Sequence, residues 1–339
     1  MNSVISDYIR FLRLPGLGGL ATPAVFGAIC VGVTDFPILL ILLLIGAFSV
    51  IYGFVLNDWV DIEIDKLTSE LHERPLVKGT ISEKTAIFIC FICVIGAYLT
   101  ITLLFYKSEI TYFKLLAIVC ISLAGILGSI YNLYGKRIIG SDFLVAITNG
   151  LIVLFGALAV TEESTINIIT WIIVILTINQ LLYMNAIEGG LKDADHDYRI
   201  NVKNIALKSG VKIDKKNNLV IPNIFKGFGL GIRFISAVLV FIPFVFFRYK
   251  YEIWQLAILL LLIIGVFYSS IKMLNMKKFD RSKLKKLITS HAYLRYSIVP
   301  IMLITIIDIW GALILIFYPI LWYVLLAPLS GEKHFKPRM

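Results

Sequence analysis

The chain has 339 residues, of which 59% are hydrophobic and 16% are charged. That hydrophobic share excludes an ordinary soluble domain, in which about 45–50% of the residues are apolar. The formal net charge of +10 does not point to nucleic acid as a partner. The basic residues gather in a few connections between apolar runs, where they indicate the orientation of a membrane protein.

Apolar runs long enough to cross the roughly 30 Å of a bilayer's hydrocarbon core recur along almost the whole chain. Helices satisfy their own backbone groups in lipid, so the runs predict an all-α, polytopic transmembrane bundle. We expect a single domain over residues 1–339, with halves at about 10–140 and 141–325. We predict nine spans, with a tenth possible, at about 16–34, 36–57, 85–105, 112–133, 143–160, 166–187, 229–247, 253–274 and 296–327.

The connections on one side of the predicted membrane carry far more Lys and Arg than those on the other. If the N-terminus is cytoplasmic, the inside segments up to residue 295 hold 23 of these residues, and the outside loops hold three: Lys107, Arg248 and Lys250. Positive charge collects on the cytoplasmic side of membrane proteins. We therefore expect an integral protein of the cell (plasma) membrane, with its N-terminus and its long polar loops in the cytoplasm.

The last apolar stretch is long for one span, contains Asp308 near its middle, and is interrupted by Gly311 and Pro319. One tilted, kinked helix would leave the basic C-terminal tail outside. Two short spans would return it to the cytoplasm, in agreement with the charge asymmetry. Both readings stay open from the sequence alone.

At the end of the second apolar run, Asn57, Asp61 and Asp65 are spaced four residues apart. On an α-helix each such step advances about 40° around the axis, so the three side chains form one stripe. Carboxylates stacked at a bilayer edge repel one another and are costly to desolvate unless a cation holds them. The stripe predicts a metal ion, or a ligand that a metal ion carries.

Asp193 and Asp197 repeat this spacing on the same predicted side, and Gly189 and Gly190 allow a break in the helix before them. Two such sites facing each other fit a diphosphate held through two divalent ions. Mg²⁺ prefers oxygen ligands and combines one or two carboxylates with phosphate oxygens of the substrate. Basic side chains able to reach phosphate lie on the same side: Arg74, Lys136, Arg137 and Lys192.

The order and spacing of these motifs resemble the UbiA-type intramembrane prenyltransferases. Asn57-Asp58-x-x-Asp61-x-x-x-Asp65, followed by Arg74-Pro75-Leu76, is similar to their first signature, and Asp193-x-x-x-Asp197 is similar to the second. Tyr131-Asn-Leu-Tyr134-Gly-Lys136-Arg137 resembles the element that these enzymes carry between spans four and five. The likeness covers about residues 10 to 325. The chain departs from the family pattern at Glu70, where a basic residue is usual, at Asn201, where Gly is common, and at Asn204, where Ser or Thr is common.

The resemblance implies a helical bundle around a central cavity that opens laterally to lipid. It implies Mg²⁺-dependent transfer of a polyprenyl group from an allylic prenyl diphosphate to a lipid or aromatic acceptor, with release of diphosphate. Two Mg²⁺ ions are expected, one at Asn57, Asp61 and Asp65 with Asp58 beside them, and one at Asp193 and Asp197. Arg74, Lys136, Arg137 and Lys192 would bind the diphosphate, and Asp61, Asp193 and Tyr131 would take part in catalysis.

Alternatives remain within and outside this reading. A cation-coupled secondary transporter also uses intramembrane carboxylates, although Asp308, the one clear mid-span carboxylate, is explained more simply as a structural cap at a kink near Gly311. Within the family, the acceptor could belong to quinone biosynthesis, or be a glycerol phosphate ether lipid or a carotenoid. No protein partner is inferred. The remaining loop charges are interpreted as solvated: Glu63, Asp195, Lys203 and the run Lys212–Lys216.

Overall fold

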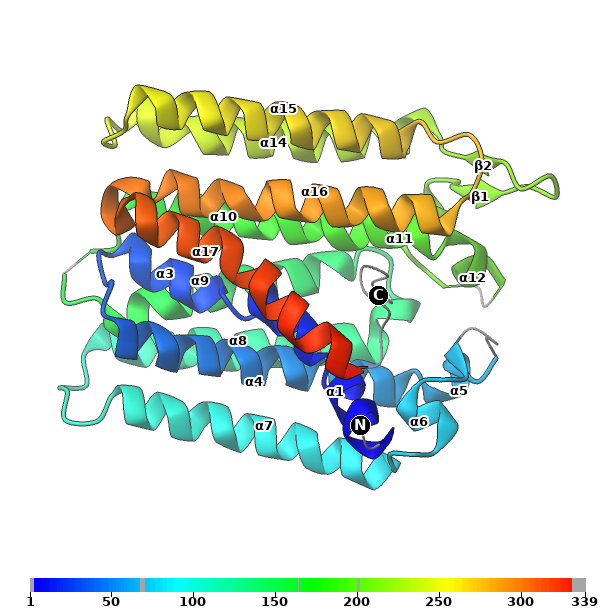
Figure 1. Ribbon diagram of the computed structural model, residues 1–339, viewed down its shortest axis with the longest axis horizontal. Helices are drawn as coiled ribbons and strands as arrows, with labels where there is room; N and C mark the ends of the chain where they lie inside the picture. The colour runs from blue at the N-terminus through cyan, green and yellow to red at the C-terminus, as the bar shows by residue number, and fades with distance from the viewer. Residues whose placement is uncertain (1–2, 68–70, 164, 200–201, 331–339) are drawn as a thin grey trace.

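The computed structural model describes residues 3–67, 71–163, 165–199 and 202–330, and its long helices run side by side in one bundle (Figure 1). The long helices are α4 (Phe36–Val60), α7 (Glu83–Leu104), α8 (Tyr112–Tyr134), α9 (Asp142–Val160), α10 (Ile168–Leu182), α14 (Asn223–Phe246), α15 (Ile253–Leu274), α16 (Arg281–Met302) and α17 (Ile304–Leu326). The chain begins with α1 (Ser3–Phe11), the 3₁₀ turn η1 (Leu14–Gly16), α2 (Leu17–Leu20) and α3 (Pro23–Cys30).

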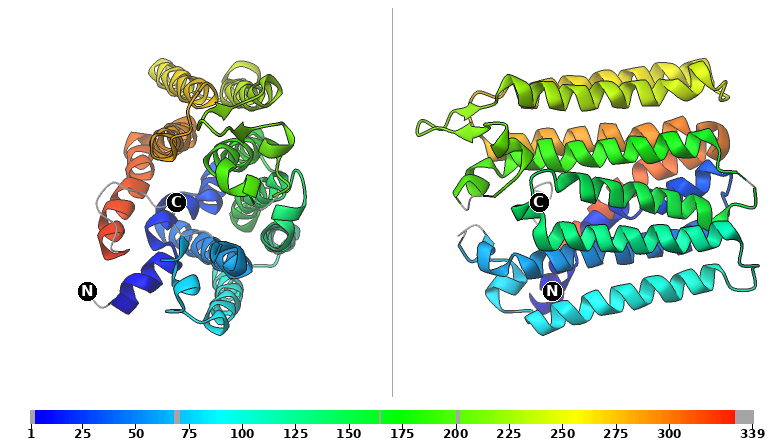
Figure 2. Two further views of the ribbon diagram at one scale, coloured as in Figure 1. Left: turned by 90° about the vertical axis from the view of Figure 1, so that its right-hand side faces the viewer. Right: turned by 180° about the vertical axis from the view of Figure 1, so that it is seen from behind.

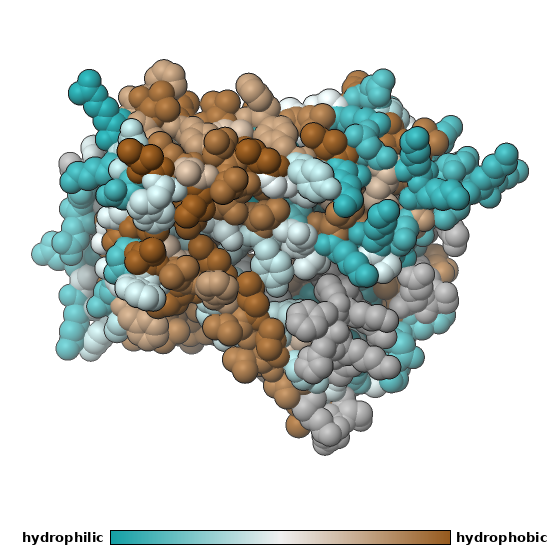
Figure 3. All heavy atoms as spheres, turned by 45° about the horizontal axis from the view of Figure 1, so that its top comes forward, coloured by the Kyte–Doolittle hydropathy of each residue, from teal (hydrophilic) through white to brown (hydrophobic). Residues whose placement is uncertain are grey.

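The described part of the chain contains eight helices long and apolar enough to cross a membrane. The number becomes nine if the bent pair Val4–Phe11 and Leu14–Cys30, which meet at 42°, counts as one span. Hydrophobic residues form a band across the middle of the surface in Figure 3, and hydrophilic residues gather at the two ends. The expected polytopic helical membrane protein is therefore confirmed.

The C-terminal region consists of two helices, but their bounds differ from the two short spans that one sequence reading placed within residues 296–327. Helix α16 begins at Arg281, well before the apolar stretch predicted to start at residue 296, and the chain turns back at Leu303 into α17. The indole of Trp322 on α17 donates a 2.8 Å hydrogen bond to the carbonyl of Leu14. The end of α17 therefore lies beside the N-terminal segment, at the same end of the bundle (Figure 1).

A kink near the start of α17 is formed by Asp308. Its backbone leaves the helical region at φ 57°, and its carboxylate accepts hydrogen bonds from the backbone of Trp310 at 2.7 Å and of Gly311 at 2.9 Å. The carboxylate thus satisfies N–H groups that the break would otherwise leave unpaired. The structural explanation of this mid-span carboxylate is confirmed.

Helices α3 and α9 approach each other at backbone distance. A Cβ atom at Gly156 would lie 1.9 Å from the carbonyl oxygen of Ala24, and one at Gly27 would lie 1.9 Å from that of Val153. Lipid tails are as apolar as Leu, so membrane helices gain stability from close packing, and small residues at the contact allow it. These two glycines place the first span against the centre of the bundle.

The short elements gather at one end of the bundle, on the right of Figure 1. They are α5 (Ile62–Asp65), α6 (Pro75–Lys78), the 3₁₀ turn η3 (Gly135–Arg137), the π-helix η4 (Tyr183–Gly189), α11 (Gly190–Lys192), α12 (Ala194–Arg199), α13 (Ile205–Lys208), the antiparallel strands β1 (Lys212–Ile213) and β2 (Leu219–Val220), and the 3₁₀ turn η5 (Ala327–Ser330). Both acidic motifs belong to this end, as predicted. Seen end-on in Figure 2, α14 and α15 form an outer pair over α10 and α16.

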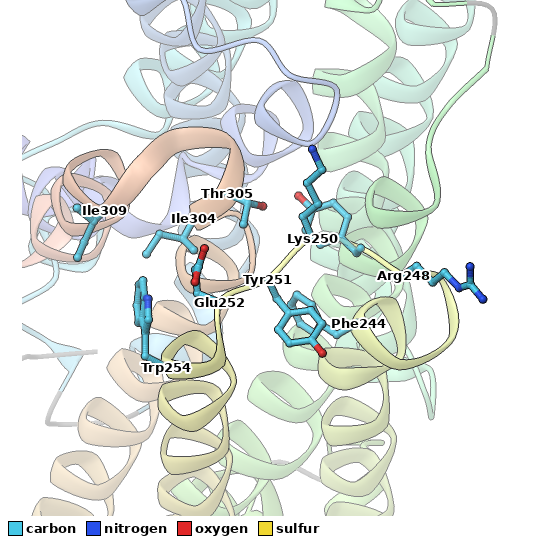
Figure 4. A pocket seen from close by; sticks show the side chains of 10 residues that line it. Phe244, Arg248, Lys250, Tyr251, Glu252, Trp254, Ile304, Thr305 and Ile309 are labelled. Atoms are coloured by element: carbon cyan, nitrogen blue, oxygen red, sulfur yellow. The ribbon is translucent and has the colours of Figure 1, made fainter.

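A cavity of about 770 Å³ lies at the opposite end, where the α14–α15 connection meets the start of α17 (Figure 4). Phe244, Tyr251 and Trp254 line it together with Arg248 and Lys250. Because both acidic motifs lie at the other end of the bundle, this cavity is not part of the predicted active site. The central cavity that the family resemblance implies stays a prediction.

Candidate active site

The first acidic motif lies where α4 ends. Helix α4 stops at Val60, Asp61 follows as its C-cap, and α5 continues to Asp65. The amide of Asp61 donates to the carbonyl of Asn57 at 3.0 Å, and the amide of Asp65 donates to that of Asp61 at 2.8 Å. Helical hydrogen bonding therefore continues across the break and keeps the three side chains on successive turns. Asp61 and Asp65 are buried, and Asn57 is half-buried.

Each carboxylate of this motif contacts a basic side chain from another part of the chain. Arg74 reaches Asp65 at 2.5 Å and Asp58 at 3.3 Å through the same guanidinium nitrogen. Lys136, in the turn after α8, lies 2.8 Å from Asp61. The structure thus brings together two basic residues and three acidic residues that the sequence singled out.

Burial and charge act against each other in this group. Burial raises the pKa of Asp65 above its usual range, and Arg74 offsets only part of that rise. Burial also opposes the charge of Arg74, but Asp58 and Asp65 outweigh it and raise the pKa of the guanidinium. Arg74 is held in reach because it caps α6, whose Pro75 and Leu76 are buried.

The second acidic motif has the same local construction. Asp193 ends α11, and Asp197 lies on α12. The amide of Asp193 donates to Gly189 and that of Asp197 donates to Asp193, each at 2.9 Å. The ammonium of Lys192 lies 3.4 Å from the Asp193 carboxylate. The break that the sequence suggests at Gly189 and Gly190 does not occur. Both keep helical backbone angles within the π-helix η4 and α11, and the chain leaves the helix only at Asp193.

Asp197 is stabilised by a residue that the sequence marked only as a departure from the family pattern. The amide of Asn204 donates to Asp197 at 2.7 Å, while its oxygen caps α13 by accepting from Leu207 at 2.8 Å. Burial, followed by the charge of Asp193, raises the pKa of Asp197 to about 7, against the opposing effects of Lys136 and Asn204. The other two departures, Glu70 and Asn201, lie outside the described residues.

The turn after α8 connects the two motifs. Besides the contact of its side chain with Asp61, Lys136 accepts a 2.9 Å hydrogen bond from the backbone of Lys203, in the loop that follows the second motif. Tyr131 lies on the last turn of α8, just before this turn. Lys136 therefore links the first motif to the segment that follows the second.

Three residues near the site differ from what the sequence predicted. Arg137 is exposed and makes no ion pair with any described residue. Asp195, interpreted as a solvated loop charge, is instead half-buried and pairs with Arg281 at 2.5 Å. Arg13 was missed: it donates to Asp58 at 2.9 Å and lies 4.3 Å from the centre of the Phe54 ring. Its only signal in the sequence is a basic residue just before the first span.

The donor chemistry of the site fits Mg²⁺ shared with a substrate better than a closed protein cage. Among the described residues, no three His, Cys, Asp or Glu side chains lie together in a way that would enclose a metal. Mg²⁺ usually takes only one or two carboxylates and completes its octahedron with waters and substrate phosphate. Each motif offers two carboxylates four residues apart, and the first adds the amide oxygen of Asn57.

Comparisons with known proteins agree with this geometry. The chain is 30% identical over 256 residues to the digeranylgeranylglyceryl phosphate synthase of Saccharolobus solfataricus, which covers 71% of this chain and 84% of that one. It is 28% identical over 223 residues to the 4-hydroxybenzoate octaprenyltransferase of Blochmanniella floridana, covering 65% and 72%. The solved structure of a UbiA homolog from Archaeoglobus fulgidus bound to GPP and Mg²⁺ has the same fold, with a TM-score of 0.60 at 19% identity over 88% of this chain and 99% of that one.

The family model of the UbiA prenyltransferases matches residues 20–277, which include both acidic motifs and the turn after α8. The resemblance read from the sequence is thereby confirmed. The match ends before α16 and α17, so these two helices extend beyond it. The chain belongs to the UbiA prenyltransferase family and is a membrane-embedded prenyltransferase.

Proposed function

We propose that this enzyme transfers a polyprenyl group from an allylic prenyl diphosphate to a lipophilic or aromatic acceptor at the membrane, depends on two Mg²⁺ ions, and releases diphosphate. The observation that carries the proposal is the meeting of the two acidic motifs around Lys136 at one end of the bundle. Acidic residues alone would repel a diphosphate. Basic side chains next to them provide the complementary half of a site for a metal–diphosphate complex.

The main proposed role of these residues is to stabilise the departing diphosphate. When the allylic C–O bond breaks, negative charge accumulates on the diphosphate, and donors aimed at that charge lower the barrier. Bound Mg²⁺ supplies Lewis-acid neutralisation of the same charge. Arg74 and Lys136 lie where charge-assisted hydrogen bonds to phosphate oxygens are possible, and Lys192 and Arg137 border them.

The ion pairs of the site suggest how the substrate complex is accommodated. Asp58 and Asp65 hold Arg74, and Asp61 holds Lys136. These carboxylates are also the proposed ligands of the metal. Binding would then exchange partners, because each carboxylate turns from a basic side chain to an ion while that basic side chain turns to phosphate. Opposite charges remain paired throughout, which keeps the cost of burial low.

Tyr131 is proposed to act on the carbon side of the broken bond. It lies on the last turn of α8, just before Lys136, and an aromatic face attracts a nearby cation. The surrounding apolar helices would exclude water from the allylic cation, so that the acceptor can capture it. The prenyl tail would lie among the apolar side chains of the bundle.

The acceptor is proposed to belong to quinone or isoprenoid-lipid biosynthesis. The names of two relatives point to different acceptors, 4-hydroxybenzoate and a glycerol phosphate lipid.

The transporter alternative has lost its support, since Asp308 serves as a local cap and the family is enzymatic. We further propose that the enzyme lies in the plasma membrane with the acidic end in the cytoplasm, in line with the distribution of Lys and Arg.

A panel of prenyl diphosphates combined with acceptors tests this proposal. The purified protein is incubated with 4-hydroxybenzoate, a glycerol phosphate ether lipid or a carotenoid precursor, with Mg²⁺ or with EDTA. Products are identified by mass, and diphosphate is measured separately. We expect one acceptor class to be prenylated, with stoichiometric diphosphate release that EDTA abolishes. Turnover that persists unchanged in EDTA would contradict the metal dependence, and a folded protein that converts no acceptor would contradict the proposed substrates.

A further inference from the structure

A cluster of buried charged side chains lies behind the second acidic motif, where α10, α14, α15 and α16 meet (Figures 1 and 2). Glu188, on the π-helix η4, is hydrogen-bonded to His291 of α16 and lies 3.8 Å from Arg295 of the same helix. Arg233 of α14 lies 3.4 Å from the centre of the Tyr183 ring. All five side chains are at least nine-tenths buried, and none belongs to the predicted site.

Such a cluster is costly inside a membrane protein and therefore calls for an explanation. Ionisable residues within spans are rare and usually functional. Because a carboxylate only accepts hydrogen bonds, the Nδ1 atom of His291 donates to Glu188, and its Nε2 atom lies 3.3 Å from the hydroxyl of Ser270 on α15. Arg295 also donates to the backbone carbonyl of Gln180 at 3.1 Å. The α16 side chains thus hold both the side chain and the backbone of the segment that leads into the motif.

Through the π-helix, the contacts between Glu188 and α16 affect the orientation of the acidic residues that follow. A π-helical turn contains an extra residue, and each extra residue rotates the chain beyond it by about 100° relative to a continuous α-helix. Asp193 is hydrogen-bonded directly to Gly189, the last residue of η4, and Asp197 is bonded to Asp193. The direction in which both carboxylates point therefore depends on η4 keeping its wide turns.

Helix α16 also contacts the second acidic motif directly, through its first residue. Arg281, its first residue, reaches Asp195 at 2.5 Å and donates to the carbonyl of Lys192 at 3.3 Å. The helix therefore holds the chain on both sides of Asp193, through Glu188 before it and through Asp195 after it. Neither contact uses the carboxylates of Asp193 and Asp197, which remain available for ligands.

We propose that Glu188, held by His291 and Arg295, is a positioning residue that keeps the π-helix wound so that Asp193 and Asp197 face the first motif. This proposal rests on the proposed function, because it assigns those two aspartates to metal binding. Groups that orient metal ligands from behind typically affect metal affinity or activity by about 10- to 100-fold. The tie to α16 would have this effect without touching the metal or the substrate.

Two isosteric substitutions of His291 test the proposal. The amide nitrogen of Asn stands near the position of Nδ1, whereas that of Gln reaches the position of Nε2. His291→Asn keeps a donor for Glu188, and we expect its half-saturating Mg²⁺ concentration to stay within about twofold of wild type. His291→Gln directs its donor toward Ser270, and we expect that concentration to rise roughly tenfold. Ser270→Ala, the control, should leave it unchanged.

Two further measurements separate the positioning role from plain destabilisation. In the metal-free protein, amide hydrogen exchange over residues 189–197 should be faster in His291→Gln than in His291→Asn, because a loosened segment opens more often. Arg295→Gln, which removes the other α16 contact of Glu188, should raise the Mg²⁺ requirement in the same direction. If His291→Gln and Arg295→Gln lower only the melting temperature and leave the Mg²⁺ dependence and the exchange at wild-type values, the positioning role is overturned.

Failure of the proposed function gives a different result. Full activity in Asp193→Ala would remove the basis for metal binding at the second motif, whatever the His291 variants do. Loss of activity in Asp193→Ala together with wild-type Mg²⁺ dependence in His291→Gln would leave the proposed function standing and overturn the positioning role alone.

Discussion

Asp61 and Asp193 occupy matching positions in the two halves of the chain. Each is the residue at which a helix stops, and each is followed by a one- or two-turn helix that carries a second aspartate. A helix end leaves carbonyl groups unpaired and turns the chain, which brings a side chain at that point out toward the end of the bundle. The same local device thus presents a carboxylate twice.

Loss of either aspartate should stop the reaction. Asp61→Ala and Asp193→Ala remove proposed metal ligands, so transition-state stabilisation of the diphosphate is lost, and we expect turnover to fall by on the order of 100-fold or more. Glu63→Ala is the control, because Glu63 belongs to the same segment and its side chain is 81% exposed. Diphosphate release at saturating Mg²⁺ measures the effect, and near-normal turnover in both aspartate variants would contradict the two-metal proposal.

Asp197 gives the metal-free protein a pH dependence of known sign. Burial raises its pKa to about 7 in the folded state, so the folded protein binds a proton that the unfolded chain has already released. The stability that this proton contributes is full below the unfolded pKa, falls as the pH rises, and is lost above about 7.

The substitution Asp197→Asn mimics the protonated carboxyl at every pH. Relative to wild type in EDTA, it should therefore be more stabilising at pH 8 than at pH 5.5, by roughly 1–3 kcal/mol. Thermal unfolding of both proteins across that range measures the difference. A constant difference between the two melting temperatures would show that Asp197 does not titrate there.

Among the elements, α3 and α9 depend on a single pair of glycines. Gly156→Ala should destabilise the protein by about 2 kcal/mol or more, because its Cβ would overlap the backbone of Ala24 and force the helices apart. Gly125→Ala, the same change on α8, meets nothing within 4 Å and should alter stability by less than about 1 kcal/mol. Thermal unfolding in detergent compares them, and equal losses would contradict the close approach.

The sequence predicts those elements whose signal lies within a single segment of the chain. Apolar length places most spans, and four-residue spacing places both acidic motifs at helix ends, because each of these signals lies within one segment. The start of α16 at Arg281 was missed since its first half is rich in Lys and Arg. The partners of Arg281 and His291 on this helix are Asp195 and Glu188, which come from about 90 to 100 residues earlier in the chain.

The sequence does not predict which site residues pair, because the partners also come from distant segments of the chain. Arg13 follows a short helix and has a left-handed backbone with φ 50°, a turn that nothing in its neighbours signals, and only the folded chain brings it to Asp58. Asn204 looked like a simple departure from the family pattern until its contact with Asp197 was seen. Contacts between distant segments decide which charges are paired, and spacing alone carries no information about them.

For the whole molecule, the turn at Leu303 makes α16 and α17 antiparallel neighbours, and the end of α17 lies at the same end of the bundle as the N-terminal segment. With the proposed cytoplasmic N-terminus, a cysteine introduced at Leu329 should react with a membrane-impermeant maleimide only after cell lysis. Cysteines at Lys107 and Lys250, on the loops proposed to lie outside, should react in intact cells. The native cysteines lie within the helices and serve as background. Labelling of Leu329→Cys in intact cells would contradict the common side of the two ends.

The hydrogen bond from Trp322 to Leu14 has a consequence for biosynthesis. It joins residues 308 positions apart, and a ribosome adding about 5–20 residues per second needs roughly 15–60 s between the two. During that interval the carbonyl of Leu14 lacks this hydrogen bond. The segment that carries Arg13 thus gains this contact with α17 only after both acidic motifs have been synthesised.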